Sequence, residues 1–449
     1  MGVGNGTTGP AAPVPGLCVY IPEIFLPADG PDMHNWPVIA CDQYTSSPEY
    51  WDGVQRRVAE AGSPSAYHLV LPELYLDHPG ERSVDERIRT INRTMAEYLA
   101  QGALQSYGQC LVLVDRSTRT SPSRIGLMVA VDLDAYDFRE GSRAPIRATE
   151  GTVLDRIPPR LQIRRDAALE IPHVMLLADD PARTILEPLA ACCRAGSFQM
   201  LYDIDLPEDG GHITGYRIPA DSDAAWEALH AMTLLPSYRD NGLLFAVGDG
   251  NHSLATAKTH WENIRAACPP DHPARFALVE LVNIHDSGLT FEPIHRVVFG
   301  VTPEDLVRQA SALLPDAGIH VSDAMTLDNA VLMTSAIDSA VQPFVIFSGD
   351  RAMVATFQHP PSAFTAGTAQ LLVDRYLGEY GSDARVDYIH GMEDTVALSA
   401  QGTGILLPAL PKETFFDVIA QHGSLPRKTF SMGEAYEKRY YMECKKIVL

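Results

Sequence analysis

Residues 243–261 carry the clearest change of hydrophobic pattern in the chain. The consecutive apolar residues 243–247 have the length and composition of a buried strand. A polar, glycine-containing turn, 248–252, interrupts them, and apolar residues then recur at helical spacing through 254–264. Ser253 offers a hydroxyl that can cap this helix. The pattern therefore predicts a strand, a turn and a helix N-terminus, where free N–H groups and the helix dipole favour an anion such as phosphate.

A second strand, polar loop and helix are predicted near the N-terminus. The apolar residues 36–40 run into the hydrogen-bonding side chains of 41–48, and a helix follows from about residue 49 to residue 61. Such a loop at a helix N-terminus suits ligand binding, but it is equally typical of an Asx or Ser/Thr turn that only caps the helix. Both interpretations stay open at this point.

Further helices and paired strands predict a mixed α/β fold. A helix is expected at 83–101, a pair of strands at 110–114 and 125–131, and a hairpin of 200–204 with 212–218. The expected organisation is a disordered lead-in followed by two structured parts. These are a lead-in at 1–16, a main α/β domain at 17–300 that contains the glycine turn, and a C-terminal α/β lobe at 301–449 that packs back on it.

Residues 276–284 and 289–299 have the pattern of two long strands joined by the glycine turn 286–288. We therefore expect a hairpin, with Pro293 restricting the second strand to an edge or a bulge. The facing ends of the two strands carry polar side chains, which are Asn283, His285, Glu292, His295 and Arg296.

The composition of the 449-residue chain argues against several kinds of partner. There are 35 Lys and Arg against 57 Asp and Glu, for a formal net charge of −22, so the basic stripe of a nucleic-acid surface is not expected. No apolar run approaches the roughly 20 residues of a membrane span, and the N-terminus lacks the pattern of a secretory signal. The seven cysteines are scattered without a CxxC pair, which favours a reducing cytoplasm over a disulfide framework or a zinc site.

Basic residues gather at 145–160 in this acidic chain. Arg147 and Arg156 belong to this segment, with Glu150 between them. The rigid guanidinium group of arginine suits a phosphate or a carboxylate. Taken by itself, however, the cluster is explained slightly better by salt bridges among these three residues and Asp155.

Standard catalytic motifs do not occur in the sequence, which has no GxxxxGK[ST] loop, GxGxxG turn after a strand, GxSxG elbow or HExxH pair. Fifteen histidines would allow a metal site in principle. The candidates for such a site are His252, His285, His295 and His390 with Asp249, Asp286 and Asp387. No two of these histidines have a ligand spacing on one element, so phosphate chemistry is favoured and no metal ligand is assigned.

Five long motifs resemble the uncharacterised bacterial family known as domain of unknown function 1015. They are ACDQYTSSPEYW, IRATEGTVLDRIPPR, FAVGDGNHSLATAK, NIHDSGLTFEPIHRVV and SLPRKTFSMGEAYEKRYYMEC. The resemblance extends over nearly the whole chain from about residue 17. The central motif of the family, Asp-Gly-His-His-Arg, is similar to the phosphate-binding motif of the ParB/sulfiredoxin superfamily, which includes nucleotide-binding segregation proteins, sulfiredoxins and kinases of free serine. The resemblance implies a ParB/sulfiredoxin-like core with added lobes.

Position by position, Asp249, Gly250 and His252 match this central motif, whereas Asn251 replaces a histidine and Ser253 replaces the arginine. In the superfamily that arginine is the main clamp on the phosphates. Its absence implies that another cation takes over or that nucleotide binding is altered or lost. The basic side chains that could replace it are Lys258, Arg147, Arg156 and Arg296.

The resemblance also suggests roles for single residues. Asp42 lies in a segment, Cys41-Asp42-Gln43, that occupies the place of a Tyr-Asp-Val motif, and an early acidic residue is the general base of the serine kinases. Asp42 is therefore expected to accept the hydroxyl proton, with Asp249 and His252 as further catalytic candidates. Glu150 or Glu292 would orient a substrate amino group. The ligand-binding candidates are Gly248, Gly250, Asn251, Ser253, Lys258, Arg147, Glu150, Arg156, Glu292, His295 and Arg296.

The function expected from this resemblance is phosphorylation of a small molecule, free serine or a similar hydroxy amino acid. The expected donor is ATP or ADP with Mg²⁺, which together with a carboxylate base supplies the parts that phosphoryl transfer needs. Two alternatives stay open. One is a phosphatase acting on a phosphorylated small molecule such as phosphoserine. The other is a protein that binds a nucleotide or metabolite without turnover.

Overall fold

The chain forms two compact units, the first comprising Met1–Leu289 and Glu434–Leu449 and the second comprising Thr290–Gly433. The computed structural model describes residues 14–28, 33–77, 82–152, 154, 157–380, 384–426 and 428–449. The change of unit falls at 289/290, whereas the sequence placed a domain boundary at 300. The strand that begins at Phe291 is already part of the sheet of unit 2.

Unit 1 is built on a mixed sheet that has eleven strands among the described residues. In spatial order its path is β10 (Gln199–Asp205), β11 (His212–Pro219), β4 (Leu104–Ser117), β5 (Arg124–Asp132), β13 (Phe276–Asn283), β9 (Met175–Ala178), β12 (Phe245–Asp249), β7 (Ile146–Arg147) and β6 (Tyr136–Asp137), while β1 (Val19–Tyr20) pairs with β5 and β2 (Glu23–Pro27) pairs with β4. The predicted strand pair and the predicted hairpin β10–β11 are confirmed.

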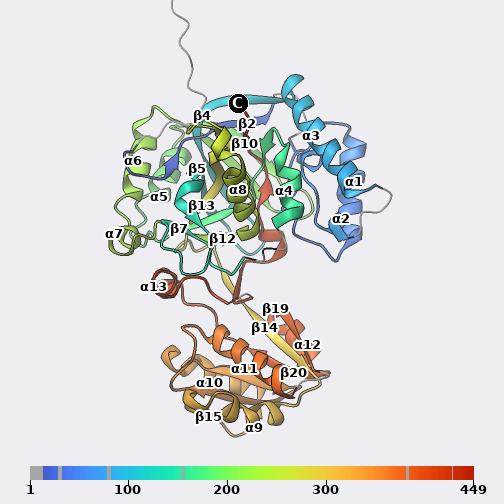
Figure 1. The fold of residues 1–449 in the computed structure, drawn as a ribbon, viewed down its shortest axis with the longest axis vertical. Coiled ribbons are helices and arrows are strands. Elements are labelled where there is room, and N and C mark those ends of the chain that lie inside the picture. Colours follow the sequence, from blue (N-terminus) through green and yellow to red (C-terminus); the bar gives the residue numbers. More distant parts are fainter. Residues whose placement is uncertain are drawn as a thin grey trace, which may run out of the picture. The chain divides into compact units, whose positions relative to one another are not determined.

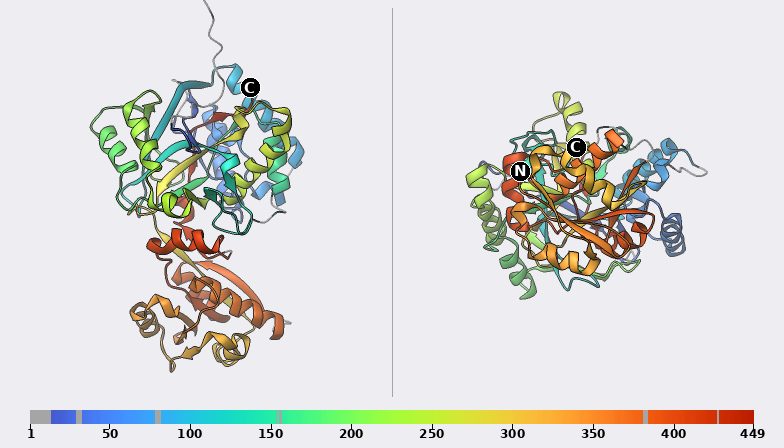
Figure 2. Two further views of the ribbon diagram at one scale, coloured as in Figure 1. Left: turned by 60° about the vertical axis from the view of Figure 1, so that its left-hand side comes forward. Right: turned by 90° about the horizontal axis from the view of Figure 1, so that it is seen from below.

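Helices cover both faces of this sheet because successive side chains of its central strands alternate between two cores. Leu111 and Leu113 of β4 pack in the core that includes α5, α6 and α8, whereas Val112 and Val114 pack in the core that includes α1 and α3. In Figure 1 and Figure 2, α5, α6 and α7 gather on one side of unit 1. The helices of this unit are α1 (Pro48–Ala61), α2 (Leu74–Asp77), α3 (Val84–Ala100), α4 (Ile157–Arg165), α5 (Leu186–Arg194), α6 (Asp223–Met232), α7 (Pro236–Asn241) and α8 (Asn251–Ile264). The helix predicted at 83–101 is confirmed by α3.

Two small sheets join the C-terminal segment to the rest of unit 1. The strand β22 (Tyr440–Tyr441) pairs with β3 (Val38–Ile39), and β23 (Lys445–Lys446) pairs with β8 (Leu169–Glu170). These pairings bring residues 438–441 next to the loop after β3 and next to the loop between β8 and β9. The candidate site is built from these segments.

Unit 2 is also mixed α/β, and its sheet has eight strands among the described residues. The path is β15 (Ile319–Val321), β18 (Arg351–Phe357), β17 (Phe344–Ser348), β20 (Gly402–Leu406), β14 (Phe291–Phe299) and β19 (Arg385–His390), with β16 (Met325–Thr326) paired to β18 and β21 (Phe430–Met432) paired to β14. Its helices are α9 (Pro303–Leu313), α10 (Leu327–Ala336), α11 (Thr365–Tyr380), α12 (Met392–Ser399) and α13 (Lys412–His422). The α/β character expected of both parts of the chain is confirmed.

The hairpin predicted from 276–284 and 289–299 is wrong, although both strands exist. β13 pairs with β5 on one edge and with β9 on the other, and every residue along it is buried. With both of its edges occupied in unit 1, β13 has none left for β14, which pairs with β19, β20 and β21 in unit 2. The polar residues at the predicted facing ends are therefore divided between the two units.

Among the described residues, no helix combines the length and the apolar composition that crossing a membrane requires.

Candidate functional site

The predicted strand, turn and helix at 243–261 are confirmed by β12 and α8, with one correction at the helix start. α8 begins at Asn251, with Gly250 as its N-cap, so Ser253 lies inside the first turn and does not cap the helix. Gly250 has φ of 79°, and a Cβ atom at this position would lie 3.0 Å from Cα of Val174. Glycine is required there both by the left-handed backbone and by the close approach of the β8–β9 loop.

Gly248 lies where the pairing of β12 with β9 changes register, between Val247 and Asp249. An irregularity of this kind can redirect the next side chain. The carboxylate of Asp249 accepts a hydrogen bond from the backbone N–H of Gly250 at 2.8 Å and forms an ion pair with Nζ of Lys438 at 3.1 Å. Both side chains are largely covered, with exposed fractions of 22% for Asp249 and 11% for Lys438.

Asp42 lies in the loop between β3 and α1, and its carboxylate faces His173. The distance from Oδ2 of Asp42 to Nε2 of His173 is 3.9 Å, and Nε2 of Gln43 donates to Oδ1 at 3.0 Å. Burial alone would raise the pKa of Asp42. The electrostatic attraction of His173, the hydrogen bond from Gln43 and the charge on Lys438 outweigh burial and hold this pKa below its usual value. Asp42 is therefore ionised at neutral pH.

His173 is oriented by Tyr441, whose hydroxyl lies 2.8 Å from Nδ1. The same hydroxyl accepts a hydrogen bond from the backbone N–H of Cys41 at 3.2 Å, so its own proton is available for Nδ1 of His173. Burial keeps the pKa of Tyr441 well above its usual range, and the hydroxyl stays protonated. This arrangement supports the tautomer of His173 with its proton on Nε2, the nitrogen that faces Asp42.

The structure thus brings together two of the predicted carboxylates, Asp42 and Asp249, through two side chains that the sequence did not single out, His173 and Lys438. Lys438 pairs with Asp249 and also lowers the pKa of Asp42, which places its ammonium group within electrostatic reach of both carboxylates. One signal for Lys438 was present in the sequence, because it belongs to the basic and aromatic C-terminal motif.

The segment 147–151 contacts the turn through Thr149. The backbone N–H of Thr149 donates to Oδ1 of Asn251 at 3.3 Å, and its hydroxyl donates to the carbonyl of Val247. Arg147 is buried, and its Nε donates to the carbonyl of Ala144 at 2.8 Å. Burial, helped by the charge of Arg143, lowers the pKa of Arg147. Of the other residues predicted nearby, Glu150 and His252 are half-buried, and Arg156 lies outside the described residues.

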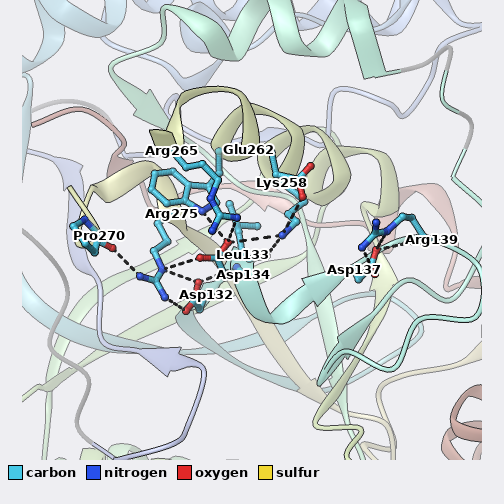
Figure 3. Close-up of polar contacts among 11 residues, drawn as sticks. Asp132, Leu133, Asp134, Asp137, Arg139, Lys258, Glu262, Arg265, Pro270 and Arg275 are labelled. Carbon is cyan, nitrogen blue, oxygen red and sulfur yellow. Dashed lines mark hydrogen bonds and ion pairs between the residues drawn. The ribbon is translucent and has the colours of Figure 1, made fainter. Parts of the chain in front are cut away.

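Lys258 is held further along α8. Its Nζ donates to the carbonyl of Leu133 at 2.9 Å and lies 3.3 Å from Oε1 of Glu262, in the direction of the helix C-terminus (Figure 3). In the same cluster, Asp134 accepts from Arg265. These contacts fasten α8 to the short helix η2 (Leu133–Ala135) and account for the buried ammonium group of Lys258.

Glu292, His295 and Arg296 belong to β14 in unit 2. His295 is buried, and its Nδ1 accepts from the backbone N–H of Leu407 at 3.2 Å. Burial, the charge of Arg296 and the charge of His390 lower the pKa of His295 to about 4. Arg296 has no exposed surface and donates to carbonyl oxygens of its own unit. The structure does not assemble these three residues with the turn in one unit.

One family model matches residues 25–373, more than half of the chain. The chain belongs to DUF1015, a family described as a protein of unknown function. No curated protein matches it.

Solved structures similar to this DUF1015 chain include a conserved hypothetical protein from Pyrococcus furiosus, with 10% identity, a TM-score of 0.35, and coverage of 72% of this chain and 95% of that one. A free serine kinase in complex with AMP is similar at 10% identity and a TM-score of 0.37, over 71% of this chain and 92% of that one. SbnI from Staphylococcus aureus, with a C-terminal truncation, is similar at 13% identity and a TM-score of 0.33, over 68% of this chain and 82% of that one. At these scores the likeness carries no conclusion about activity.

The family match in this DUF1015 chain ends at residue 373, before the C-terminal segment that supplies Lys438 and Tyr441. The part of the site formed by these two residues therefore comes from outside the matched residues. The carboxylates Asp42 and Asp249 and the histidine His173 all lie inside the match.

Proposed function

We propose that unit 1 is a phosphotransferase that phosphorylates a small hydroxy compound, free serine or a similar hydroxy amino acid, with ATP or ADP as donor. The observation that carries this proposal is the group formed by Asp42, His173, Lys438 and Asp249 at the N-terminus of α8. The motif resemblance to the ParB/sulfiredoxin superfamily supports the same reaction class.

The phosphate groups of the donor would bind at the start of α8. Gly250, the N-cap, makes no side-chain capping hydrogen bond, and the helix dipole favours phosphate oxygens at this end of α8. Lys438 supplies a cation beside them, and it offers a replacement for the superfamily arginine that is missing at Ser253.

The acceptor hydroxyl would lose its proton to Asp42. This carboxylate is ionised at neutral pH and is 28% exposed, so a substrate hydroxyl can reach it. In phosphoryl transfer a carboxylate of this kind orients the nucleophile and accepts its proton. His173, held by Tyr441, keeps the carboxylate in place.

Mg²⁺ usually binds one or two carboxylates together with phosphate oxygens and water. The donor set fits this mode, because Asp42 and Asp249 supply two carboxylates, whereas the described residues contain no group of three or more metal-ligating side chains. Bound there with the donor, Mg²⁺ would neutralise charge on the phosphate oxygens.

The direct test is to incubate the full-length protein with Mg²⁺, L-serine and either ATP or ADP and to measure phosphoserine by mass spectrometry. We expect Asp42→Asn to reduce turnover about 100-fold, because the base is lost, while Asp240→Asn on the exposed face of α7 leaves turnover unchanged. Lys438→Met should weaken nucleotide binding roughly tenfold in calorimetry, since a charge-assisted contact is lost.

Asp249→Ala and His252→Ala should abolish ligand binding while circular dichroism shows a folded protein. If both variants bind normally, the site is wrongly placed. Absence of nucleotide binding in the unmodified protein would overturn the kinase proposal. Release of phosphate from phosphoserine without nucleotide would instead favour a phosphatase.

A further inference from the structure

A cavity of about 150 Å³ lies in unit 1 beside the candidate site. It is lined by residues of α4, α8, β13 and the loop between β8 and β9. His173, Tyr441 and Ser253 line it as well, so the cavity and the candidate site share these side chains. A molecule bound in the cavity would therefore lie next to the group that faces Asp42.

Most of the cavity wall is apolar. It includes side chains from six different elements or loops, among them Leu71, Met95, Ile163, Ile171, Leu254 and Leu278. An apolar cavity of about 150 Å³ is large enough for a molecule of the size of benzene. Two hydroxyls of α8 line it, those of Ser253 and Thr256, and the hydroxyl of Thr256 already donates to the carbonyl of His252 at 2.7 Å.

The charged side chains in the wall are paired with one another. Arg160 forms an ion pair with Glu73, and Arg164 binds Oε2 of Glu170 at 2.6 Å. The other oxygen of Glu170 lies 3.3 Å from Nζ of Lys445. A charged ligand would have to break these pairs, whereas an apolar group would leave them intact.

We propose that this cavity holds the apolar body of the phosphoryl acceptor, so that the substrate is a hydroxy amino acid with an aromatic or branched side chain rather than serine itself. This inference rests on the proposed function. Serine carries a single side-chain carbon and would leave the cavity empty. A purine base would place its hydrogen-bonding edge against Leu, Ile and Met side chains, where it would lack partners.

In this reaction the acceptor hydroxyl oxygen forms a bond to the terminal phosphorus of the donor, ATP or ADP. The bond from that phosphorus to the bridging oxygen breaks, and its electron pair leaves with the product nucleotide, ADP or AMP respectively. The hydroxyl proton passes to the carboxylate of Asp42. The apolar body stays in the cavity and holds the hydroxyl at the site.

The test uses threo-β-phenylserine and L-serine as probes, with the full-length protein in calorimetry. We expect phenylserine to bind at least about tenfold more tightly than serine, because its ring is buried. Ile163→Asp places a charge in the wall and should remove this preference. Leu161→Asp is the matched control, because Leu161 is also half-buried on α4 but does not line the cavity. Ile163→Trp, which fills the cavity without adding charge, should remove the preference as well.

The possible results separate this inference from the proposed function. Binding of phenylserine that Ile163→Asp abolishes, without phosphoryl transfer from any donor, would support the cavity and overturn the phosphotransferase. Phosphorylation of serine together with no preference for phenylserine would overturn the cavity assignment alone. Competition of adenosine with phenylserine would also overturn it, by showing that the cavity binds a nucleobase.

Discussion

Two buried arginines, Arg439 of unit 1 and Arg296 of unit 2, have different kinds of partner. Arg439 of unit 1 forms ion pairs with Glu280 and Glu443 and donates to the carbonyl of Pro172 at 3.1 Å. Arg296 of unit 2 donates to the carbonyl of Lys428 at 2.9 Å and to the side chain of Gln370 at 3.4 Å. Burial would lower the pKa of Arg439, but its two glutamates raise it, whereas burial lowers the pKa of Arg296 to about 10.

The difference in the partners of these two arginines is explained by the residues next to Arg439 in unit 1. Arg439 directly follows Lys438 in the chain, and its bond to Pro172 fixes the residue before His173. Buried ion pairs add little net stability, and we infer that these two serve instead to hold Lys438 and His173 in place. The hydrogen bonds of Arg296 run to carbonyl and amide oxygens of unit 2, which satisfies a buried donor without a network of this kind.

The largest expected effect comes from Arg439→Met. It removes the arginine that forms ion pairs with both Glu280 and Glu443, which should lower the free energy of unfolding of unit 1 by about 3–5 kcal/mol. Urea denaturation, monitored through the hydrogen exchange of β13 peptides, would measure this loss of stability. A loss below about 1 kcal/mol would contradict the view that the two carboxylates depend on Arg439.

Acid should weaken both units through one buried histidine in each. Burial, followed by the charge of Arg164, lowers the pKa of His260 in unit 1 to about 4, and His295 in unit 2 has the same value. The unfolded chain, with an ordinary histidine pKa of about 6.5, binds a proton that the folded chain does not. The contribution of each histidine to the free energy of unfolding is therefore fully present above about pH 6.5. It falls by about 3 kcal/mol for each histidine as the pH drops towards 4.

The variant His295→Gln should remove this loss from unit 2 and leave it in unit 1. Hydrogen exchange of β14 and α8 peptides between pH 4.5 and pH 7 would compare the two units. An unchanged acid sensitivity of β14 peptides would show that other groups control it.

Arg296→Met should cost less than Arg439→Met. It removes the hydrogen-bond donor of buried carbonyl oxygens, but it does not leave a buried carboxylate unpaired. The free energy of unfolding of unit 2 should therefore fall by about 1–3 kcal/mol. The same substitution at both positions makes the pair a matched comparison. Equal losses in urea denaturation would mean that the carboxylates of unit 1 do not cause the difference.

The sequence predicted the features of unit 1 that depend on neighbouring residues. The strand, glycine turn and helix of 243–261 follow from a local apolar run, two glycines and a helical repeat. His173 and Lys438 could not be placed in this way, because they reach the turn only through the pairing of C-terminal strands with β3 and β8. Lys258 and Arg296 looked like ligands because a sequence shows the type of a cation but not the groups that bind it.

The smallest expected effect is the difference in stability between alanine substitutions at two glycines that have a left-handed backbone. Gly349, between β17 and β18 of unit 2, has φ of 57° and no heavy atom within 4 Å of an added Cβ, so Gly349→Ala should cost only about 1 kcal/mol. Gly250→Ala meets the same backbone penalty and in addition pushes against Cα of Val174 at 3.0 Å, so we expect about 2 kcal/mol. Because Val174 follows His173, the displacement should also weaken nucleotide binding. Calorimetry would detect this for Gly250→Ala and not for Gly349→Ala, and equal binding by both variants would show that the turn does not position the site.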